Sequence, residues 1–201
     1  MGKLLSLRRV AGALSLLLAL AVLPGATPAA DSKPLTAILI TAQAEVRDPF
    51  FGGSVVLVLN NLGPVPVGVV INRPTPLTVA HLFPDQKRLA QLPDRVYFGG
   101  PVEFSSVWFL FRAAKAPEHA VRACEGVYLS ASKELLLKLL ERDKPLDGLR
   151  ILTGHAGWGP GQLEAEIARG DWKLSRAEPD VIFSGKPEHP WPGPQSPKDG
   201  A

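Results

Sequence analysis

Three polar residues suited to ligand or catalytic chemistry stand beside apolar runs in the first half of the chain. Asp48 precedes Pro49 and two phenylalanines, and its carboxylate can serve as an acid, a base or a ligand. Asn72 and Arg73 follow an apolar run and precede Pro74, which places an amide and a guanidinium at a strand end, where binding groups often lie. The structural alternative is that Asp48 accepts backbone N–H bonds in its turn and that Arg73 pairs with Asp48 or another carboxylate.

Two adjacent glycines, Gly99 and Gly100, are candidates of a different kind. Successive glycines allow backbone N–H groups to surround an anion. A tight strand exit needs glycine as well, because it tolerates backbone conformations that other residues avoid. The pair is therefore predicted either to bind an anion or to shape a turn.

The most informative stretch is GHAGWGPGQLEAEIARGDW, from Gly154 to Trp172. Its glycine-rich first half predicts a loop, and its second half predicts a helix over Pro160–Arg169, with proline at the first helical position and Gly170 as the stop. Leu163 and Ile167 lie four residues apart and predict an apolar face, with the two glutamates of the helix pointing elsewhere.

The residues around the start of this helix are the strongest binding candidates. The unpaired N–H groups of a helix N-terminus can bind a carboxylate or a phosphate. Trp158 would supply a stacking face, and His155 and Gln162 flank the same turn. A hydrogen-bonded loop histidine is the plainer interpretation of His155.

No recognised catalytic motif accompanies these candidates. The chain has no GxSxG elbow, no HExxH helix and no Walker-type phosphate loop, and its four histidines are widely spaced. Cys124 is the only cysteine, which excludes an internal disulfide and a four-thiolate metal site, and we expect it to be buried. We therefore predict no catalytic residues, no metal and no cofactor, with a hydrolase that uses Asp48 and His155 as the alternative.

The first thirty residues resemble a secretory signal peptide. Lys3, Arg8 and Arg9 precede an apolar run of 14 residues, Val10–Leu23, and small residues follow up to Ala30. The run is shorter than the roughly 20 residues that span a bilayer, so contact with the membrane is expected only during export. Residues 1–30 are thus predicted to be removed and the protein to be periplasmic or secreted. A cytoplasmic protein with an uncleaved N-terminus is the alternative.

Removal of the leader changes the charge balance. The whole chain has 22 Lys and Arg against 19 Asp and Glu, and three of the bases but none of the acids lie in the leader. The mature chain is therefore neutral, at 19 against 19. A nucleic-acid partner usually requires a concentrated basic face, so an exported neutral protein is not expected to bind nucleic acid.

The remaining chain predicts a single mixed α+β domain over residues 31–183. Helical turns are expected near 78–82 and 86–92, and a helix over 131–142 with Ser130 as its cap. A tail over 184–201, rich in proline, glycine and charge, is predicted to be disordered. Strands are expected over 35–41, 54–59, 67–71, 95–98, 107–111, 126–129, 149–153 and 181–183, with the second and third forming a hairpin.

Four blocks of sequence carry a family resemblance. The blocks DPFFGGSVVLVL, GVVINRP, VYFGGPV and AGWGPGQLEAEI occur in this order within about Leu35–Phe183. They resemble the signatures of the YqgE/AlgH family of bacterial proteins, whose function is largely undefined and some of which are named putative transcriptional regulators. The resemblance implies a curved, bifurcated or barrel-like sheet flanked by helices. His155 stands where the family often has tyrosine.

Taken together, the sequence favours a non-enzymatic binding or regulatory domain. Its expected partner is a small anion or a protein, recognised through the region of Asn72, Arg73 and Trp158. The alternatives are the hydrolase, and a transcriptional regulator as the family name implies.

Overall fold

The computed structural model describes residues 37–60 and 62–183, all of which belong to one compact unit. The predicted leader (1–30) and tail (184–201) lie outside the described residues. The helices are α1 (Val79–Leu82), the 3-10 helix η1 (Lys87–Leu89), α2 (Lys133–Leu140), α3 (Gln162–Ala168) and α4 (Pro179–Phe183). The strands are β1 (Ala37–Ala42), β2 (Val55–Leu59), β3 (Val67–Val70), β4 (Pro74–Thr78), β5 (Arg95–Phe98), β6 (Val102–Arg112), β7 (Val121–Cys124), β8 (Val127–Ser130), β9 (Leu149–Gly157) and β10 (Trp172–Arg176).

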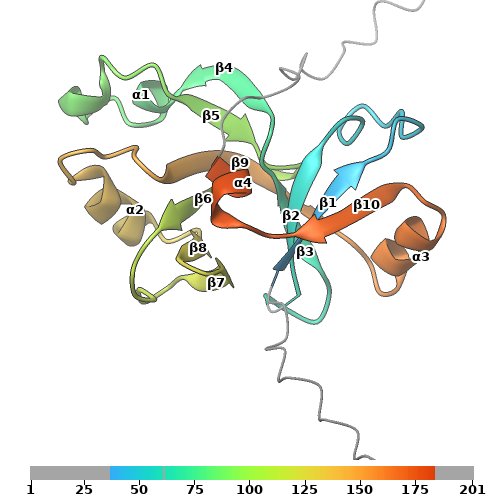
Figure 1. Ribbon diagram of the computed structural model, residues 1–201. Helices are drawn as coiled ribbons and strands as arrows, with labels where there is room; N and C mark the ends of the chain where they lie inside the picture. Colours follow the sequence, from blue (N-terminus) through green and yellow to red (C-terminus); the bar gives the residue numbers. More distant parts are fainter. Residues whose placement is uncertain (1–36, 61, 184–201) are drawn as a thin grey trace, which may run out of the picture. The chain divides into compact units, whose positions relative to one another are not determined.

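The strands form one curled sheet that branches at β9 (Figure 1). The main path runs β10-β1-β2-β3-β9-β6-β8-β7, and β5 pairs with β9 and carries β4 as a side branch. The pairing of β5 with β9 is parallel and the other pairings are antiparallel. The prediction of an α+β domain with a curved, bifurcated mixed sheet is confirmed.

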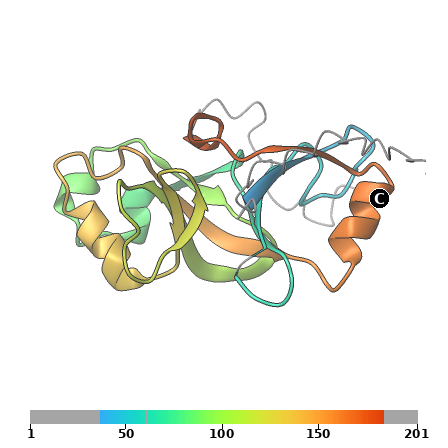
Figure 2. The ribbon, with the colours of Figure 1, turned by 60° about the horizontal axis from the view of Figure 1, so that its bottom comes forward.

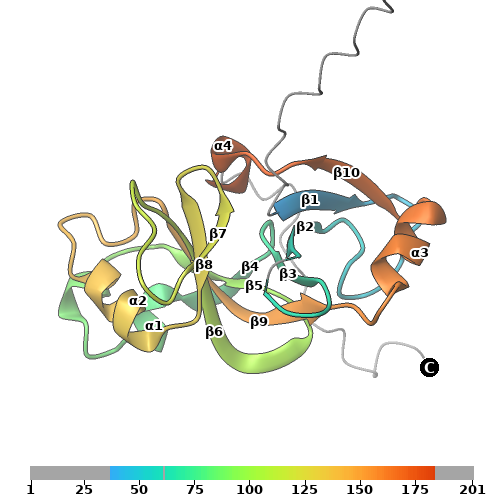
Figure 3. The same ribbon diagram turned by 90° about the horizontal axis from the view of Figure 1, so that it is seen from below.

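Strand β9 joins two groups of elements. Its first residues pair with β6 from Leu149 to Thr153, and its last two, Ala156 and Gly157, pair with β3. Figures 1 and 3 show β4 to β8, α1 and α2 gathered around one end of β9, and β1, β2, β10 and α3 around the other. In the turned view of Figure 2 helix α4 lies between the two groups. β9 therefore brings segments distant in sequence next to each other.

Strand β2 is covered on both faces, as its unbroken apolar sequence predicts. Val56 and Val58 pack into one hydrophobic cluster with Trp158 and Trp172, whereas Leu57 and Leu59 pack into a second cluster. These four side chains of β2 are fully buried. The predicted hairpin with β3 is also confirmed, with Val56 opposite Val70.

The adjacent glycines are needed where the backbone after β5 lies close to that of β9. A Cβ atom at Gly99 would lie 2.3 Å from the carbonyl oxygen of Gly154, and one at Gly100 would lie 2.2 Å from the carbonyl carbon of His155. Gly100 also has a φ of +152°. The Gly99 N–H donates to the Thr153 carbonyl at 2.8 Å, so this N–H serves the sheet rather than an anion.

The glycine-rich loop expected after residue 153 is instead the second half of β9. Gly154 and Gly157 lie within the strand, and His155 is paired with Val102 of β6. Gly154 allows close approach of another backbone, because a Cβ atom there would lie 2.3 Å from the carbonyl oxygen of Gly100, more than fifty residues away in sequence.

Strands β4, β7 and β10 were not predicted. Each pairs with a single neighbour, namely β5, β8 and β1 respectively. Edge strands need little apolar pattern, and β4 contains Pro74 and Pro76, which are tolerated at an edge. The sequence therefore lacks the alternation that identifies the inner strands.

The predicted strand at 181–183 is wrong, because these are the last three residues of helix α4. Pro179 begins the helix, as suits its fixed φ, and Asp180 lies in the first turn. Ile182 is fully buried in the core shared by β2 and β3.

Helix α2 begins two residues later than its predicted start. Ser132, not Ser130, is the N-cap, and its hydroxyl accepts the Leu135 N–H at 3.3 Å. Ser130 belongs to β8, where its hydroxyl donates to the His119 carbonyl. The buried stripe is close to the prediction, with Leu136, Leu139 and Leu140 in the core and Leu135 partly buried.

Candidate functional site

Asp48 caps a turn. Its Oδ1 atom accepts the backbone N–H groups of Phe50 at 2.8 Å and Phe51 at 2.9 Å. These bonds match the structural alternative stated for this residue. Asp48 therefore fixes the turn before β2, from which the Phe50 and Phe51 rings pack against the hydrophobic core.

Asn72 and Arg73 bind the same loop from the other side. The Asn72 amide accepts the Val55 N–H at 2.9 Å and donates to the Gly53 carbonyl at 3.0 Å, and the Arg73 guanidinium donates to the Gly52 carbonyl. Arg73 is only 6% exposed. Burial lowers its pKa below the ordinary value, and the nearby Asp48 charge opposes this shift. Both side chains are therefore occupied in fixing the 52–55 backbone.

His155 belongs to β9 and is paired with Val102 of β6. Its ring packs against Trp108 with centroids 5.3 Å apart, and its buried Nδ1 atom has no hydrogen-bond partner among the described residues. Asp48 is engaged in its own turn, and neither a pocket of about 570 Å³ nor a neighbouring one of about 470 Å³ includes Asp48 or His155 among its lining residues. The cleft required by the hydrolase alternative is not among those two pockets.

Trp158 does not offer a stacking face, contrary to the prediction. The side chain is 5% exposed, and its indole N–H donates to Glu166 Oε2 at 2.9 Å. Trp172 is 6% exposed and donates to the same oxygen at 2.9 Å. Gln162 donates to the other Glu166 oxygen at 2.9 Å. Glu166 was expected to point away from the apolar face of the helix, but it joins Trp158, the residue after β9, to α3 and β10.

The predicted helix N-terminus is also displaced. Gly161 has φ 72° and ψ −3°, a left-handed conformation incompatible with a helix interior, so α3 begins at Gln162 and Pro160 lies outside it. The Gln162 amide oxygen accepts the Gly159 N–H at 3.0 Å. With seven residues in α3 and this N–H already bonded, an anion site here is not supported.

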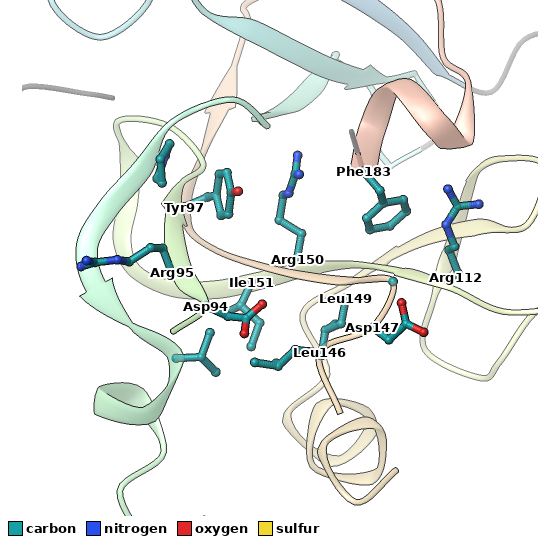
Figure 4. Close-up of a pocket in the computed structure, with 13 residues that line it drawn as sticks. Asp94, Arg95, Tyr97, Arg112, Leu146, Asp147, Leu149, Arg150, Ile151 and Phe183 are labelled. Carbon is teal, nitrogen blue, oxygen red and sulfur yellow. The ribbon is translucent and has the colours of Figure 1, made fainter. Parts of the chain in front are cut away.

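A pocket of about 570 Å³ lies elsewhere, between β4, β5, β9 and α4 (Figure 4). None of the eight candidates named from the sequence lines it. Its walls combine apolar side chains, two aromatic rings and charges of both signs. Its charged and aromatic lining residues are Asp94, Arg95, Tyr97, Arg112, Asp147, Arg150 and Phe183.

Arg150 is the buried charge of this pocket. The residue is 8% exposed, and Nη1 donates to the Ile71 carbonyl at 2.7 Å and the Ile182 carbonyl at 2.6 Å. Its guanidinium carbon lies 4.4 Å from the Tyr97 ring centroid and 6.0 Å from that of Phe183. Figure 4 shows the side chain between these two rings. Among the described residues no carboxylate forms an ion pair with it.

Desolvation governs the electrostatics of Arg150. Burial lowers its pKa from the ordinary value, and the Tyr97 phenol acts in the opposite direction. A guanidinium remains charged at neutral pH even so. Two carbonyl dipoles and two aromatic faces offset part of the desolvation, but no full negative charge does.

Two further arginines stand at the exposed rim. Arg95 donates to the Pro76 carbonyl of β4. Arg112 pairs with Asp180 of α4 at 2.9 Å and stacks its guanidinium 4.9 Å from the Phe183 centroid. Both side chains are solvated, so they add attraction for an anion at the entrance rather than a second buried charge.

A neighbouring pocket of about 470 Å³ shares Asp94, Leu146, Asp147 and Gly148 with the first. It is lined in addition by Asp143 and Lys144. Across the part of the chain that the structure describes, Asp94 and Asp147 form no ion pair. The two hollows therefore meet at a wall that carries unpaired carboxylates.

Sequence reasoning missed this site, although one signal was present. Arg150 is a charge inside the apolar run LRILT, and a buried strand admits a charge only where something compensates it. Its aromatic and carbonyl partners come from residues 71, 97, 182 and 183, which no local pattern joins.

Other kinds of site have less support in the described residues. No group of three or more His, Cys, Asp or Glu side chains there is arranged to hold a metal ion. No helix in the same residues is long and apolar enough to cross a membrane. Cys124 is partly exposed rather than buried as expected, and burial raises the pKa of its thiol.

Comparison with known proteins gives consistent matches. Residues 38–193 match a family model described as AlgH-like. A UPF0301 protein of Streptomyces avermitilis is 38% identical over 169 residues, covering 78% of this chain and 83% of the relative. A UPF0301 protein of Myxococcus xanthus is 36% identical over 163 residues, with coverages of 79% and 88%.

Solved structures agree in fold. The solution structure of the AlgH protein from Pseudomonas aeruginosa matches with a TM-score of 0.61 and 26% identity, covering 83% of this chain and 87% of that one. A crystal structure of a Corynebacterium diphtheriae protein matches with a TM-score of 0.60 and 24% identity, covering 76% and 81%.

Proposed function

The chain belongs to the AlgH-like family, whose matched relatives carry no assigned activity in their names, and we propose that it is a binding domain for a small organic anion. The anion binds in the pocket around Arg150. The observation that carries this proposal is an arginine that is 8% exposed, lines a pocket, and has no carboxylate partner among the described residues.

Burial of the Arg150 charge costs free energy unless a partner compensates it. A buried cation is stabilised best by an anion with hydrogen bonds, and carbonyl dipoles replace that anion only in part. Arg150 uses Nη1 for two carbonyls and also interacts with the Tyr97 phenol, and because a guanidinium has five N–H donors, further donors remain for a ligand. An anionic group placed at this guanidinium would supply the missing charge.

The pocket walls favour an organic anion over an inorganic one. A volume of about 570 Å³ is within the usual range of small-molecule pockets, roughly 300 to 1,000 Å³. Val79, Leu149 and Ile151 provide apolar surface, and Tyr97 and Phe183 provide rings. The lining thus recognises charge at one point and apolar or planar surface around it.

The test is binding of simple anions to the purified protein, followed by calorimetry and by amide NMR shifts. Benzoate, hexanoate and inorganic phosphate are suitable probes. We expect the two organic acids to bind more tightly than phosphate and to shift the amides of Tyr97 and Phe183. In Arg150→Gln the affinity for benzoate should fall about tenfold, as for loss of one charged hydrogen bond.

Two further variants keep the test decisive. Arg150 also holds the Ile71 and Ile182 carbonyls, so its replacement can unfold the domain. Arg95→Gln removes an exposed rim charge and should weaken benzoate binding about threefold, within the range of an exposed charge. Arg47→Gln, an exposed arginine outside the pocket, is the matched control. Absence of binding, or equal binding by Arg95→Gln and Arg47→Gln, would refute the proposal.

We also propose that binding takes place after export. The support is the charged, apolar and small-residue pattern of residues 1–30, which lie outside the described residues. N-terminal sequencing of the protein from fractionated cells tests it. A periplasmic chain that begins near Ala30 is expected, and an uncleaved cytoplasmic chain would refute export.

A further inference from the structure

We infer that the ligand of the Arg150 pocket is amphoteric, with an anionic group at Arg150 and a cationic amine on the side of Asp94 and Asp147. This inference rests on the proposed anion-binding function and assigns the class of the ligand. It is carried by the arrangement of charges in two adjoining pockets.

The larger pocket carries charges of both signs. Three arginines and two aspartates line it. Arg112 already pairs with Asp180 of α4 at 2.9 Å. The remaining cations, Arg95 and Arg150, are matched in number by Asp94 and Asp147. A ligand with only negative charge would meet two uncompensated carboxylates there.

These opposite charges are not paired with each other. Within the described residues neither Asp94 nor Asp147 forms an ion pair, although both line the same hollow as Arg95 and Arg150. In Figure 4 the Arg150 guanidinium lies on one side of β9, and Asp94 and Asp147 lie on the other side, next to Ile151 and Leu149. Separated charges of both signs are complementary to a ligand that carries both.

The larger pocket continues into the smaller one, with which it shares four lining residues. The smaller pocket opens on the aspartate side, shares Asp94 and Asp147, and adds Asp143 and Lys144, so its three carboxylates outnumber its one cation. A chain that leaves the buried guanidinium and passes the apolar residues would therefore reach carboxylates. An ammonium is the group that carboxylates recognise, and apolar carbons suit the surface between the two ends.

The experiment compares acids with their ω-amino counterparts. Butyrate, hexanoate and octanoate are titrated against 4-aminobutyrate, 6-aminohexanoate and 8-aminooctanoate, with hexylamine as the cation-only probe. We expect at least one ω-amino acid of the series to bind about fivefold more tightly than the acid of the same chain length. This gain in affinity is the size expected for an exposed ion pair. The gain should fall as salt is raised, because exposed charges are screened.

Variants assign the gain to the named carboxylates. In the double variant Asp94→Asn, Asp147→Asn the ω-amino acid should bind no more tightly than the plain acid, whose own affinity is unchanged or higher. Asp85→Asn, an exposed aspartate outside both pockets, should keep the gain. Both aspartates are exposed, so the substitutions are not expected to affect folding.

The outcomes separate the two proposals. If none of the acids binds, the anion-binding function itself is wrong. If the acids bind with Arg150 dependence but the amine adds nothing at any length, or if the gain survives in the double variant, the amphoteric assignment alone is overturned.

Discussion

Glu166 provides the sharpest test of how this fold is held together. We predict that Glu166→Ala destabilises the domain by about 3 kcal/mol, within a range of about 2 to 6 kcal/mol. One carboxylate oxygen accepts the indole N–H groups of Trp158 and Trp172, both at 2.9 Å, and the other accepts from Gln162. The variant removes all three acceptor contacts at once.

The magnitude follows from the burial of the two donors. Trp158 and Trp172 are 5% and 6% exposed, so water has little access to replace the carboxylate. A buried donor left without a partner costs about 1 to 3 kcal/mol, and two such donors give about 2 to 6 kcal/mol. We take the lower half of this range because Glu166 itself is only partly buried.

The assay is urea unfolding followed by tryptophan fluorescence and circular dichroism. Glu166→Gln keeps one oxygen and should lose about 1 to 2 kcal/mol. Glu164→Ala, on the exposed side of the same helix, is the control and should stay within about 0.5 kcal/mol of the original protein. Equal stability of Glu166→Ala and Glu164→Ala would refute the reasoning.

The same site predicts a pH dependence with a definite sign. Desolvation raises the pKa of Glu166, but hydrogen bonds from Trp172, Gln162 and Trp158 together with the Arg169 charge outweigh it, so the folded pKa lies below the ordinary value. The contribution of ionised Glu166 to the free energy of unfolding is therefore full above the unfolded pKa, about 4.3. It is lost as pH falls through the lower folded pKa. The stability difference between the original protein and Glu166→Gln should shrink over that acidic range, and a constant difference would contradict it.

Three other predictions concern the frame of the site. Gly100→Ala should destabilise the domain by more than about 3 kcal/mol or prevent folding, since its Cβ would lie 2.2 Å from the backbone of His155. Gly157→Ala is the control and should be tolerated, because nothing lies within 4 Å of its Cβ. Thermal unfolding measures the stability of both variants. Asn72→Ala should cost about 2 kcal/mol, because two backbone groups of the 53–55 segment lose their partners, and faster amide hydrogen exchange should be confined to that segment. Ser132→Ala should cost about 1 kcal/mol through loss of the α2 cap, and Ser132→Asp should restore it in urea unfolding.

Several features of the fold could be predicted because their causes are local. The run SVVLVL predicts a strand buried on both faces, and the leucine spacing before Pro145 predicts the buried stripe of α2. The four family blocks predict the branched α+β architecture, which the structure has. These predictions depend on side-chain period and on motif order, both of which can be read without knowing which segments meet.

The candidate site could not be predicted in the same way. Asp48, Asn72 and Arg73 are polar residues at strand ends, but the tertiary structure directs their hydrogen-bonding groups to the 50–55 backbone. Trp158 has the composition of a stacking residue, yet β10 and α3 cover it. Polarity shows that a side chain needs partners, and only the fold determines whether those partners are internal.

The sequence by itself determined the family, the fold class and the inner strands, because apolar periodicity and motif order are local properties of the chain. The tertiary structure alone decided that Arg150 lies buried between Tyr97 and Phe183, beside carbonyls of residues 71 and 182. The physical reason is the path of β9, whose pairing with β3, β5 and β6 brings together groups separated by up to about a hundred residues. A charge in an apolar strand can be seen in the sequence, but its environment is created only when those strands meet.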